Sequence, residues 1–290
     1  MDNHQNSCYT KRKPFEELTL ADDFLFCKVM QDESLCKELL EIILHVKIDK
    51  IKYTEPQKVL DDVIDEKSIR MDVYVKDNNH TVYDIEMQTS NTEELPKRSR
   101  YYHSCIDKGQ LAKGERYNKL RKTYVIFVCT FDLFDRNFAK YEFDTICKQD
   151  KNLTLSDDRH TVFVNAQGVT NDQKLQEFLT YLKDGEVSDS EFIQNLDKAV
   201  NYASKSSKWR EEYDMLLARE QLLIEEGRKK GLAEGMAQGL AKGVEKGLAQ
   251  GAEKERSLLI KHALQGCTPE DVSKLLGIPL HEILKVAHDV

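Results

Sequence analysis

Hydrophobic residues recur at helical spacing in two parts of the chain. Between Thr19 and Val46 they return every three or four positions, which is typical of one or two amphipathic helices. From about Asn171 a helical pattern continues almost to the C-terminus. Residues 1–17 are polar and show no such spacing, so we expect a flexible N-terminus there.

The spacing changes to strict alternation between residues 69 and 88. Apolar and polar positions alternate from Ile69 to Lys76 and again from Thr81 to Gln88, the period of strands with one buried face. The tetrapeptide Asp77-Asn78-Asn79-His80 between them is rich in turn formers. Two alternating runs around such a turn predict a β-hairpin.

The remaining elements predict the fold class. Residues 94–113 have a helical pattern, and the continuous apolar run YVIFVCT at 124–130 is typical of a strand covered on both faces. Further strands are expected near Tyr141–Phe143 and Thr161–Val164. A helix, strands, a second helix and further strands predict an α/β domain with a mixed sheet flanked by helices. A long helical C-terminal tail follows.

These patterns divide the chain into five segments. We expect a flexible N-terminus (1–17), an α/β core (18–168), a helical extension (169–225), a helix with glycine at every fourth position (226–262) and a small helix-turn-helix-like end (263–290). In the last segment Thr268 is a predicted N-cap with Pro269 at the first helical position.

Composition narrows the environment of the protein. The net charge of −8 means that nucleic-acid binding would need local positive patches on an acidic body. The seven cysteines are odd in number and form no C-x-x-C pair, which argues against a disulfide framework and a zinc ribbon. No apolar run suits a signal peptide or a membrane span, so we expect a cytoplasmic protein that does not enter the membrane.

Acidic residues mark both strands of the predicted hairpin. Glu86 and Gln88 project from one face of the second strand because side chains alternate. Asp72 lies opposite residue 85 or 86, and only pairing with Glu86 puts both carboxylates on the same face. Two adjacent carboxylates repel, and Mg²⁺ or Mn²⁺ would remove that cost. The pattern gives Asp72 and Glu86 as candidate metal ligands, with Gln88 orienting water.

An ordinary amphipathic hairpin with solvent-facing acids is the alternative interpretation of the same spacing. Any acidic protein contains such pairs, so the spacing alone favours this simpler interpretation. The segments LDDVID and YDIE count against it, because they place acids inside otherwise apolar strands.

Five ordered blocks of the sequence resemble a known family. DDFLFCKVM, RMDVYV, YDIEMQ, KRSRYYHSCIDKGQLAKGERYNKL and TYVIFVCTFDLF are similar to the Rpn-type branch (recombination-promoting nucleases, transposase-like) of the PD-(D/E)xK nuclease superfamily. The resemblance covers about residues 18–135 and continues through the tail. It implies a restriction-endonuclease-like fold with an αβββαβ core, and Mg²⁺-dependent cleavage of DNA phosphodiesters.

The resemblance also implies roles for individual residues. Asp72 matches the metal-binding aspartate of the family, and Glu86 matches the acid of its (D/E)xK element. Gln88 takes the place of the lysine, so the charge partner of the nucleophile is missing, and a migrated lysine or Arg70 would have to substitute. Asp23 is a weaker candidate for an additional acid.

A basic segment follows the hairpin. Between Lys97 and Lys122 there are nine Lys and Arg residues against two acids, a local balance of +7. Phosphate neutralisation by such residues supplies most non-specific DNA affinity. We therefore expect Arg98, Arg100 and Tyr102, together with Arg70 of the hairpin, to hold the substrate backbone. A solvated basic helix face is the alternative for this segment.

Glycine recurs at every fourth position from Gly227 to Gly251. Each of these seven glycines costs a helix about 0.8–1 kcal/mol relative to alanine, and close approach of a partner helix is the obvious compensation. A period of four turns the glycine stripe by about 40° per step in a straight helix. We expect a homo-oligomer formed through this C-terminal helix, with a semi-flexible linker as the alternative.

These patterns support two functions from different classes. The first is a Mg²⁺-dependent DNA endonuclease associated with transposition or recombination. The second is a catalytically weakened DNA-binding or oligomeric interaction protein on a nuclease scaffold. An RNA nuclease would use the same chemistry, and the sequence does not separate the two polymers.

Overall fold

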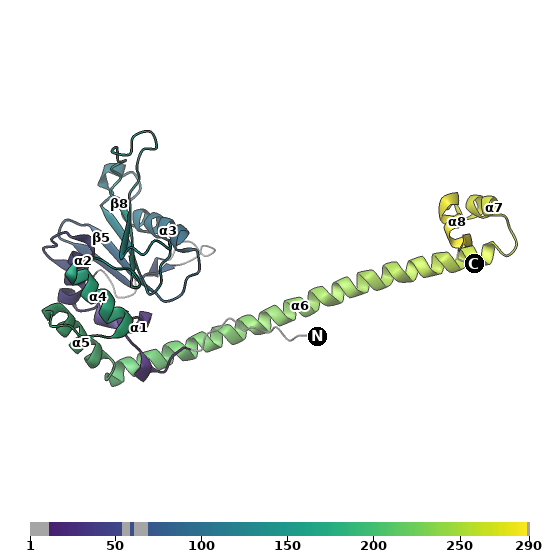
Figure 1. Cartoon of the computed structure of the whole chain (residues 1–290). Coiled ribbons are helices and arrows are strands. Elements are labelled where there is room, and N and C mark those ends of the chain that lie inside the picture. The colour runs from purple at the N-terminus through teal and green to yellow at the C-terminus, as the bar shows by residue number, and fades with distance from the viewer. Residues whose placement is uncertain (1–11, 54–58, 61–68, 289–290) are drawn as a thin grey trace. The chain divides into compact units, whose positions relative to one another are not determined.

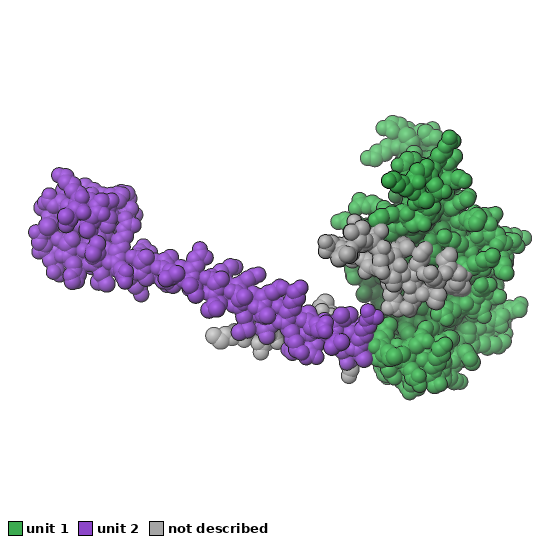
Figure 2. Space-filling view, turned by 180° about the vertical axis from the view of Figure 1, so that it is seen from behind, with its two compact units in different colours: residues 1–216 green, residues 217–290 purple. Residues whose placement is uncertain are grey.

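The computed structural model describes residues 12–53, 59–60 and 69–288. The chain forms two compact units, residues 1–216 and residues 217–290, which are coloured separately in Figure 2. The division falls within one helix, α6 (Ser207–Ala263). Each unit has its own hydrophobic core, so each is described by itself.

The first unit is built on a six-stranded mixed sheet with strand order β1-β4-β5-β6-β8-β7 (Figure 1). Its strands are β1 (Ile51–Tyr53), β4 (Val73–Asp77), β5 (Val82–Gln88), β6 (Thr123–Cys129), β7 (Lys140–Phe143) and β8 (Arg159–Asn165). Parallel pairing joins β5 to β6 and β6 to β8, and the other neighbours are antiparallel. A separate ladder pairs β2 (Val59–Leu60) with β3 (Ile69–Arg70).

Helices cover the sheet on both sides. They are α1 (Asp23–Val29), α2 (Glu33–Leu44), α3 (Leu95–Lys108), α4 (Gln173–Asp184) and α5 (Glu191–Ala203), with 3-10 turns η1 (Phe15–Glu17) and η2 (Tyr117–Lys119). In Figure 1, α3 lies on one side of the sheet, and α1, α2, α4 and α5 gather on the other. The α/β class with a mixed sheet flanked by helices is therefore confirmed.

The central strands carry no exposed face because both sides of the sheet are covered. All but the last residue of β5 are buried, and five consecutive residues of β6, from Val125 to Cys129, are buried too. Aromatic and aliphatic side chains of α3 pack on this sheet in one cluster with Val82, Phe127 and Phe163. A continuous apolar run such as YVIFVCT is the sequence expected of a strand in this position.

The predicted hairpin forms, with β4 and β5 as its strands. Its first strand begins at Val73 instead of Ile69, because residues 69–70 pair with β2 and leave the ladder of β4. The helix predicted over 94–113 ends at Lys108, with Gly109 as its C-cap. The expected acidic strand LDDVID begins in β2, and its residues 61–65 lie outside the described residues.

The second unit consists of most of α6 together with α7 (Pro269–Leu276) and α8 (Leu280–His288). Ile260, Val272 and Ile283 form its small core. The predicted cap is present, since the Thr268 hydroxyl accepts a hydrogen bond from the Asp271 amide at 3.3 Å. None of the helices that the structure describes is long and apolar enough to cross a membrane.

Helix α6 continues through all seven glycines of the ladder as one 57-residue helix. A methyl group added at any of these glycines would meet no atom within 4 Å. The apolar residues that follow five of them are Leu232, Met236, Leu240, Val244 and Leu248, with exposed fractions of 53–72%. Among the described residues no neighbour packs against these glycines to offset their low helix propensity.

Candidate functional site

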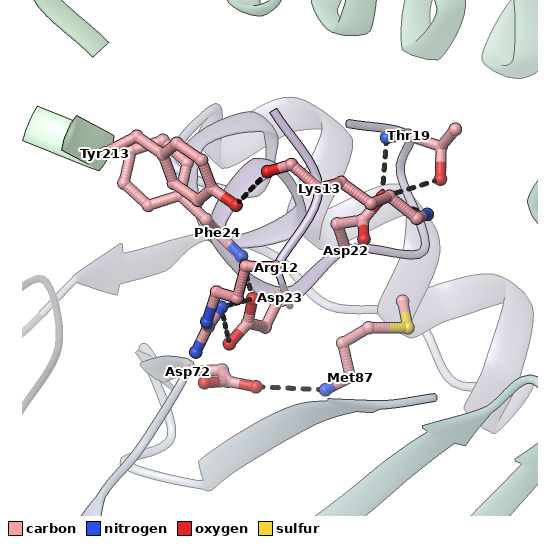
Figure 3. A network of polar contacts seen from close by, with 9 residues as sticks. All are labelled: Arg12, Lys13, Thr19, Asp22, Asp23, Phe24, Asp72, Met87 and Tyr213. Atoms are coloured by element: carbon pink, nitrogen blue, oxygen red, sulfur yellow. Dashed lines mark hydrogen bonds and ion pairs between the residues drawn. The ribbon is translucent and has the colours of Figure 1, made fainter. Parts of the chain in front are cut away.

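The register of the hairpin brings two acids opposite each other. Val73 pairs with Ile85, so Asp72 lies one step beyond the ladder, opposite Glu86. The Asp72 amide donates to Glu86 Oε1 at 3.0 Å. In return the Met87 amide donates to Asp72 Oδ2 at 3.1 Å (Figure 3). Each acid therefore accepts a hydrogen bond from the backbone of the opposite strand segment.

Glu86 is buried in an environment that opposes its charge. Its side chain is only 2% exposed. Burial first, and then the charge of Asp72, raises the pKa of Glu86 from 4.5 to about 8. Hydrogen bonding to the Asp72 backbone and the positive charge of Arg98 act in the opposite direction. A proton or a cation is thus needed to hold these two carboxyl groups together at neutral pH.

Arg98 reaches into this acidic pair from α3. Its Nη2 donates to Glu86 Oε2 at 3.1 Å, and its Nη1 donates to Gln88 Oε1 at 3.0 Å. Tyr102, one helical turn later, accepts from Arg98 Nη2 at 2.7 Å and donates to Glu86 Oε2 at 3.4 Å. The guanidinium also lies over the Phe127 ring, 5.6 Å from its centroid. Arg98 and Tyr102 are therefore part of the acidic site itself.

Asp84 is a third acid that the sequence interpretation did not assign to the site. It lies two residues before Glu86 on the same face of β5 and is fully buried. Neither carboxyl oxygen has a hydrogen-bond partner among the residues that the structure describes. Burial first, and then the charges of Glu86 and Asp72, raises its pKa well above 3.8. The acid inside the apolar stretch YDIE was the sequence signal for this position.

A cleft of about 440 Å³ lies at the carboxyl end of β5. Asp22 and Asp23 from the start of α1 line it, together with Met87 and Gln88. Arg12 Nη1 donates to the two oxygens of Asp23 at 3.0 and 3.3 Å (Figure 3). Asp23, the weaker candidate for an additional acid of the site, therefore lines the same cleft as Gln88.

The other two residues predicted to contact the substrate are Arg100 and Arg70. Arg100 is exposed on α3, and its carbonyl oxygen accepts a hydrogen bond from the Ser104 hydroxyl at 3.0 Å. The backbone of Arg70 belongs to β3, but its side chain lies outside what the structure describes. Of the four residues predicted to contact the substrate backbone, Arg98 and Tyr102 lie beside the acids.

The donor set fits a hard divalent cation with few protein ligands. In the described part of the chain no group of three or more His, Cys, Asp and Glu side chains is arranged to hold a metal ion. Mg²⁺ commonly uses only one or two carboxylates, with water and substrate phosphates as the other ligands. Asp72 and Glu86 are the residues of this site that could supply such ligands. Burial first, and then repulsion by Asp72, raises the pKa of Glu86, and a bound cation would offset both.

Comparison with protein-family models gives one match. Residues 21–226, more than half of the chain, match a family described as PD-(D/E)XK nuclease family transposase. The matched region contains the hairpin, α3 and both central strands of the sheet. Comparisons with curated proteins and with solved structures gave no match.

Proposed function

Because the chain belongs to the PD-(D/E)XK nuclease family transposases, we propose that it is a Mg²⁺-dependent DNA endonuclease acting in transposition or recombination. The observation that carries this proposal is a pair of hydrogen bonds across the hairpin, from the Asp72 amide to Glu86 and from the Met87 amide to Asp72. These bonds hold the two acids opposite each other, where we propose that they share one cation. Such an arrangement suits hydrolysis of a phosphodiester.

In this proposal Asp72 and Glu86 hold the Mg²⁺ ion, and Mn²⁺ can take its place. A bound Mg²⁺ supplies Lewis-acid polarisation of the scissile phosphate and favours deprotonation of a water molecule. Glu86 must lose its proton to bind a cation, and Arg98 favours that ionised form. The Met87 amide donates a hydrogen bond to the Asp72 carboxylate. This bond would orient Asp72 as a metal ligand before the substrate arrives.

Gln88 and Arg98 together stand where the family has a single lysine. The Gln88 carbonyl oxygen accepts from Arg98, which leaves the Gln88 amide N–H groups to donate to water or to the scissile phosphate. The guanidinium places a fixed positive charge next to that amide. We propose that Arg98 thereby supplies the charge that Gln88 lacks, with Tyr102 holding it in place. Arg100 would contact the backbone further out.

A binding protein without cleavage is the second candidate. The observation that favours it is that both oxygens of Glu86 already have protein donors, Asp72 on one side and Arg98 on the other. If these contacts persist when DNA is bound, Glu86 is not available to a cation. The chain would then bind DNA on a nuclease scaffold without cutting it.

Cleavage of supercoiled plasmid separates the two candidates. Wild-type protein with Mg²⁺ should nick or linearise the plasmid, while EDTA or Asp72→Asn should stop it. Glu94→Gln is a suitable control, because Glu94 is exposed and makes no capping hydrogen bond at the start of α3. If wild type and Asp72→Asn both bind the plasmid and leave it intact, the binding protein is the better description.

We also propose that α6 joins copies of this chain into a homo-oligomer. The exposed apolar residues beside the glycines support this, because a second helix would cover them. The glycines would allow its backbone to come close. A stripe with a period of four suits a right-handed pair of helices better than a straight one.

A further inference from the structure

A second cleft lies at the other end of β5, away from the acidic site. It has a volume of about 270 Å³ and is lined in part by Val82, the first residue of β5. Gln88, at the acidic site, is the last residue of the same strand. Six residues of extended chain separate the two positions by about 20 Å. This cleft, which we call the basic cleft, is therefore distinct from the acidic site.

Positively charged side chains from three segments converge on the basic cleft. Lys76 comes from β4, Lys119 from η2 and Arg121 from the loop before β6. The acid in its lining is Glu115, whose Oε2 already accepts a hydrogen bond from the Ala112 amide at 2.7 Å. His80 adds a ring N–H from the hairpin turn. The lining therefore carries a positive excess in a protein whose net charge is −8.

The basic cleft also contains a buried hydrogen-bond donor that no described residue satisfies. The Arg121 amide donates to Gln110 Oε1 at 2.7 Å. Because a backbone N–H requires an acceptor, this contact fixes which side of the Gln110 amide is oxygen. Gln110 Nε2 is buried and has no hydrogen-bond partner within the described parts of the chain. Buried amide groups are normally satisfied, so this donor calls for an acceptor beyond the described residues, which a bound ligand would supply.

We propose that the basic cleft binds a phosphate group. A phosphate offers several acceptor oxygens and negative charge, which matches Lys76, Lys119 and Arg121. One of its oxygens would accept the unsatisfied N–H of Gln110. Arginine and lysine are the residues that proteins use most for this ligand. A cation is disfavoured by the same charges, and an apolar ligand would leave the Gln110 donor unsatisfied.

The phosphate has two possible sources, the backbone of a nucleic acid or free phosphate. If it comes from duplex DNA held at the acidic site, about 20 Å corresponds to about six base pairs along the helix axis. The basic cleft would then grip the backbone at a distance from the bond that is cut. If it comes from solution, the cleft is a separate anion site. The inference does not depend on cleavage, because it concerns binding alone.

Binding measurements on the full chain in EDTA test the inference. The cleft variant Lys119→Gln/Arg121→Gln removes two charges from the lining, and Gln110→Glu keeps the acceptor for the Arg121 amide while replacing the donor by a carboxylate. The control variant Lys113→Gln/Arg116→Gln removes two exposed charges from the same loop outside the cleft. Affinity for a 20-base-pair duplex is measured by fluorescence anisotropy at several salt concentrations, and affinity for inorganic phosphate by calorimetry.

Each source predicts a different pattern. For a DNA phosphate, the cleft variant binds duplex at least tenfold more weakly than the control at 0.1 M salt, because each lost phosphate contact costs about tenfold there. Its salt slope is also shallower by about two. If the ligand is free phosphate, wild type and the control variant bind inorganic phosphate, whereas the cleft variant and Gln110→Glu do not. The cleft variant and Gln110→Glu then bind duplex as tightly as the control variant does.

The inference is overturned if cleft and control variants bind both ligands equally. Thermal melting of each variant shows whether a loss of binding reflects unfolding. Lys119 and Arg121 are exposed, so we expect their replacement to leave the melting temperature unchanged. Since these measurements contain no Mg²⁺, their failure leaves the endonuclease proposal intact. Conversely, an inactive enzyme whose basic cleft still binds phosphate would count against the endonuclease alone.

Discussion

Strand β5 and the glycine ladder of α6 both carry features that destabilise the isolated chain, but they do so in opposite surroundings. In β5 the cost arises from burial, because Asp84 and Glu86 lie inside the sheet with raised pKa values. In α6 the cost arises from exposure, because no described residue packs against the seven glycines and the apolar side chains beside them are more than half exposed. A small cation would relieve the first cost, and only a large surface would relieve the second.

The comparison shows where to look for the partner of an unfavourable sequence feature. A buried acid without a hydrogen bond calls for something that fits inside the fold, such as a proton or a metal ion. An exposed helix with glycines at regular spacing calls for another helix. Variants that remove each feature should therefore have effects of different kinds, on chemistry in β5 and on assembly in α6.

Among variants that keep both proposed metal ligands, the largest effect is expected for the charge beside Gln88. Arg98→Gln should lower the cleavage rate by about a hundredfold, as for loss of one preorganised donor in an active site. Without Arg98 the pKa of Glu86 rises further, since the guanidinium favours the ionised carboxylate. Duplex binding in EDTA should fall by less than tenfold. Single-turnover cleavage measures the first quantity and anisotropy the second.

Arg100→Gln is the matched control for that variant. Arg100 is exposed on the same helix, and its removal takes away the same charge without a contact to Glu86 or Gln88. Equal loss of cleavage in both variants would show that Arg98 acts only as a general basic group.

Alanine in the glycine ladder should have the next largest effect. Gly239→Ala/Gly243→Ala favours the helix by about 2 kcal/mol in total. In a close-packed oligomer the added methyl groups should nevertheless raise the dissociation constant by about tenfold or more. Light scattering across a concentration series measures the mass. Unchanged association together with a more stable helix would indicate that α6 is a plain linker.

Replacing the buried acid Asp84 should stabilise the protein. Asp84→Val removes two unsatisfied oxygens from a strand interior and should increase the free energy of unfolding by about 1–3 kcal/mol. The folded-state pKa of Asp84 is raised, so the folded protein keeps a proton that the unfolded chain releases above pH 3.8. The gain should therefore widen as the pH rises above 4. Urea denaturation at pH 5 and pH 8 tests this, and a gain independent of pH contradicts it.

The hairpin could be predicted from the sequence to within one residue of its register, whereas the position of Arg98 could not. Strict alternation and a short turn left Asp72 opposite residue 85 or 86, and the observed pairing of Val73 with Ile85 selects Glu86. The contact between Arg98 and Glu86 depends on how α3 packs over the sheet, which the spacing of α3 does not specify. Asp84 was predictable only in part. The sequence shows an acid inside an apolar strand, but it does not show whether that acid has a hydrogen-bond partner.

The basic cleft had no clear sequence signal beyond a local excess of positive charge. The unsatisfied side of Gln110 depends on its contact with the Arg121 amide, eleven residues later in a loop. In α6 the glycine spacing and its cost to a helix are evident from the sequence. Helix propensity alone did not decide between a continuous helix and a frayed linker. The structure has a continuous helix there.

The smallest effect is expected at His103, which lies on α3 and bonds to strands β6 and β8. Its ring nitrogens bond to Thr123 and Thr161 at 2.9 and 3.1 Å. Burial is the main cause that lowers its pKa from 6.5 to about 3. The unfolded chain therefore binds a proton that the folded protein excludes, and stability falls as the pH drops from 6.5 towards 3. His103→Gln should show a shallower fall between pH 6.5 and 4.5 by thermal melting. A slope equal to that of wild type would contradict this.

The central claim is that Asp72 and Glu86 share one cation, and Mn²⁺ titration followed by electron paramagnetic resonance measures this directly. Wild-type protein at pH 8 should bind Mn²⁺ in a site that Asp72→Asn and Glu86→Gln each abolish, while Glu94→Gln retains it. Addition of Mg²⁺ should displace the bound Mn²⁺. Equal Mn²⁺ binding by wild type and both site variants, or no binding by any of them, would contradict the claim.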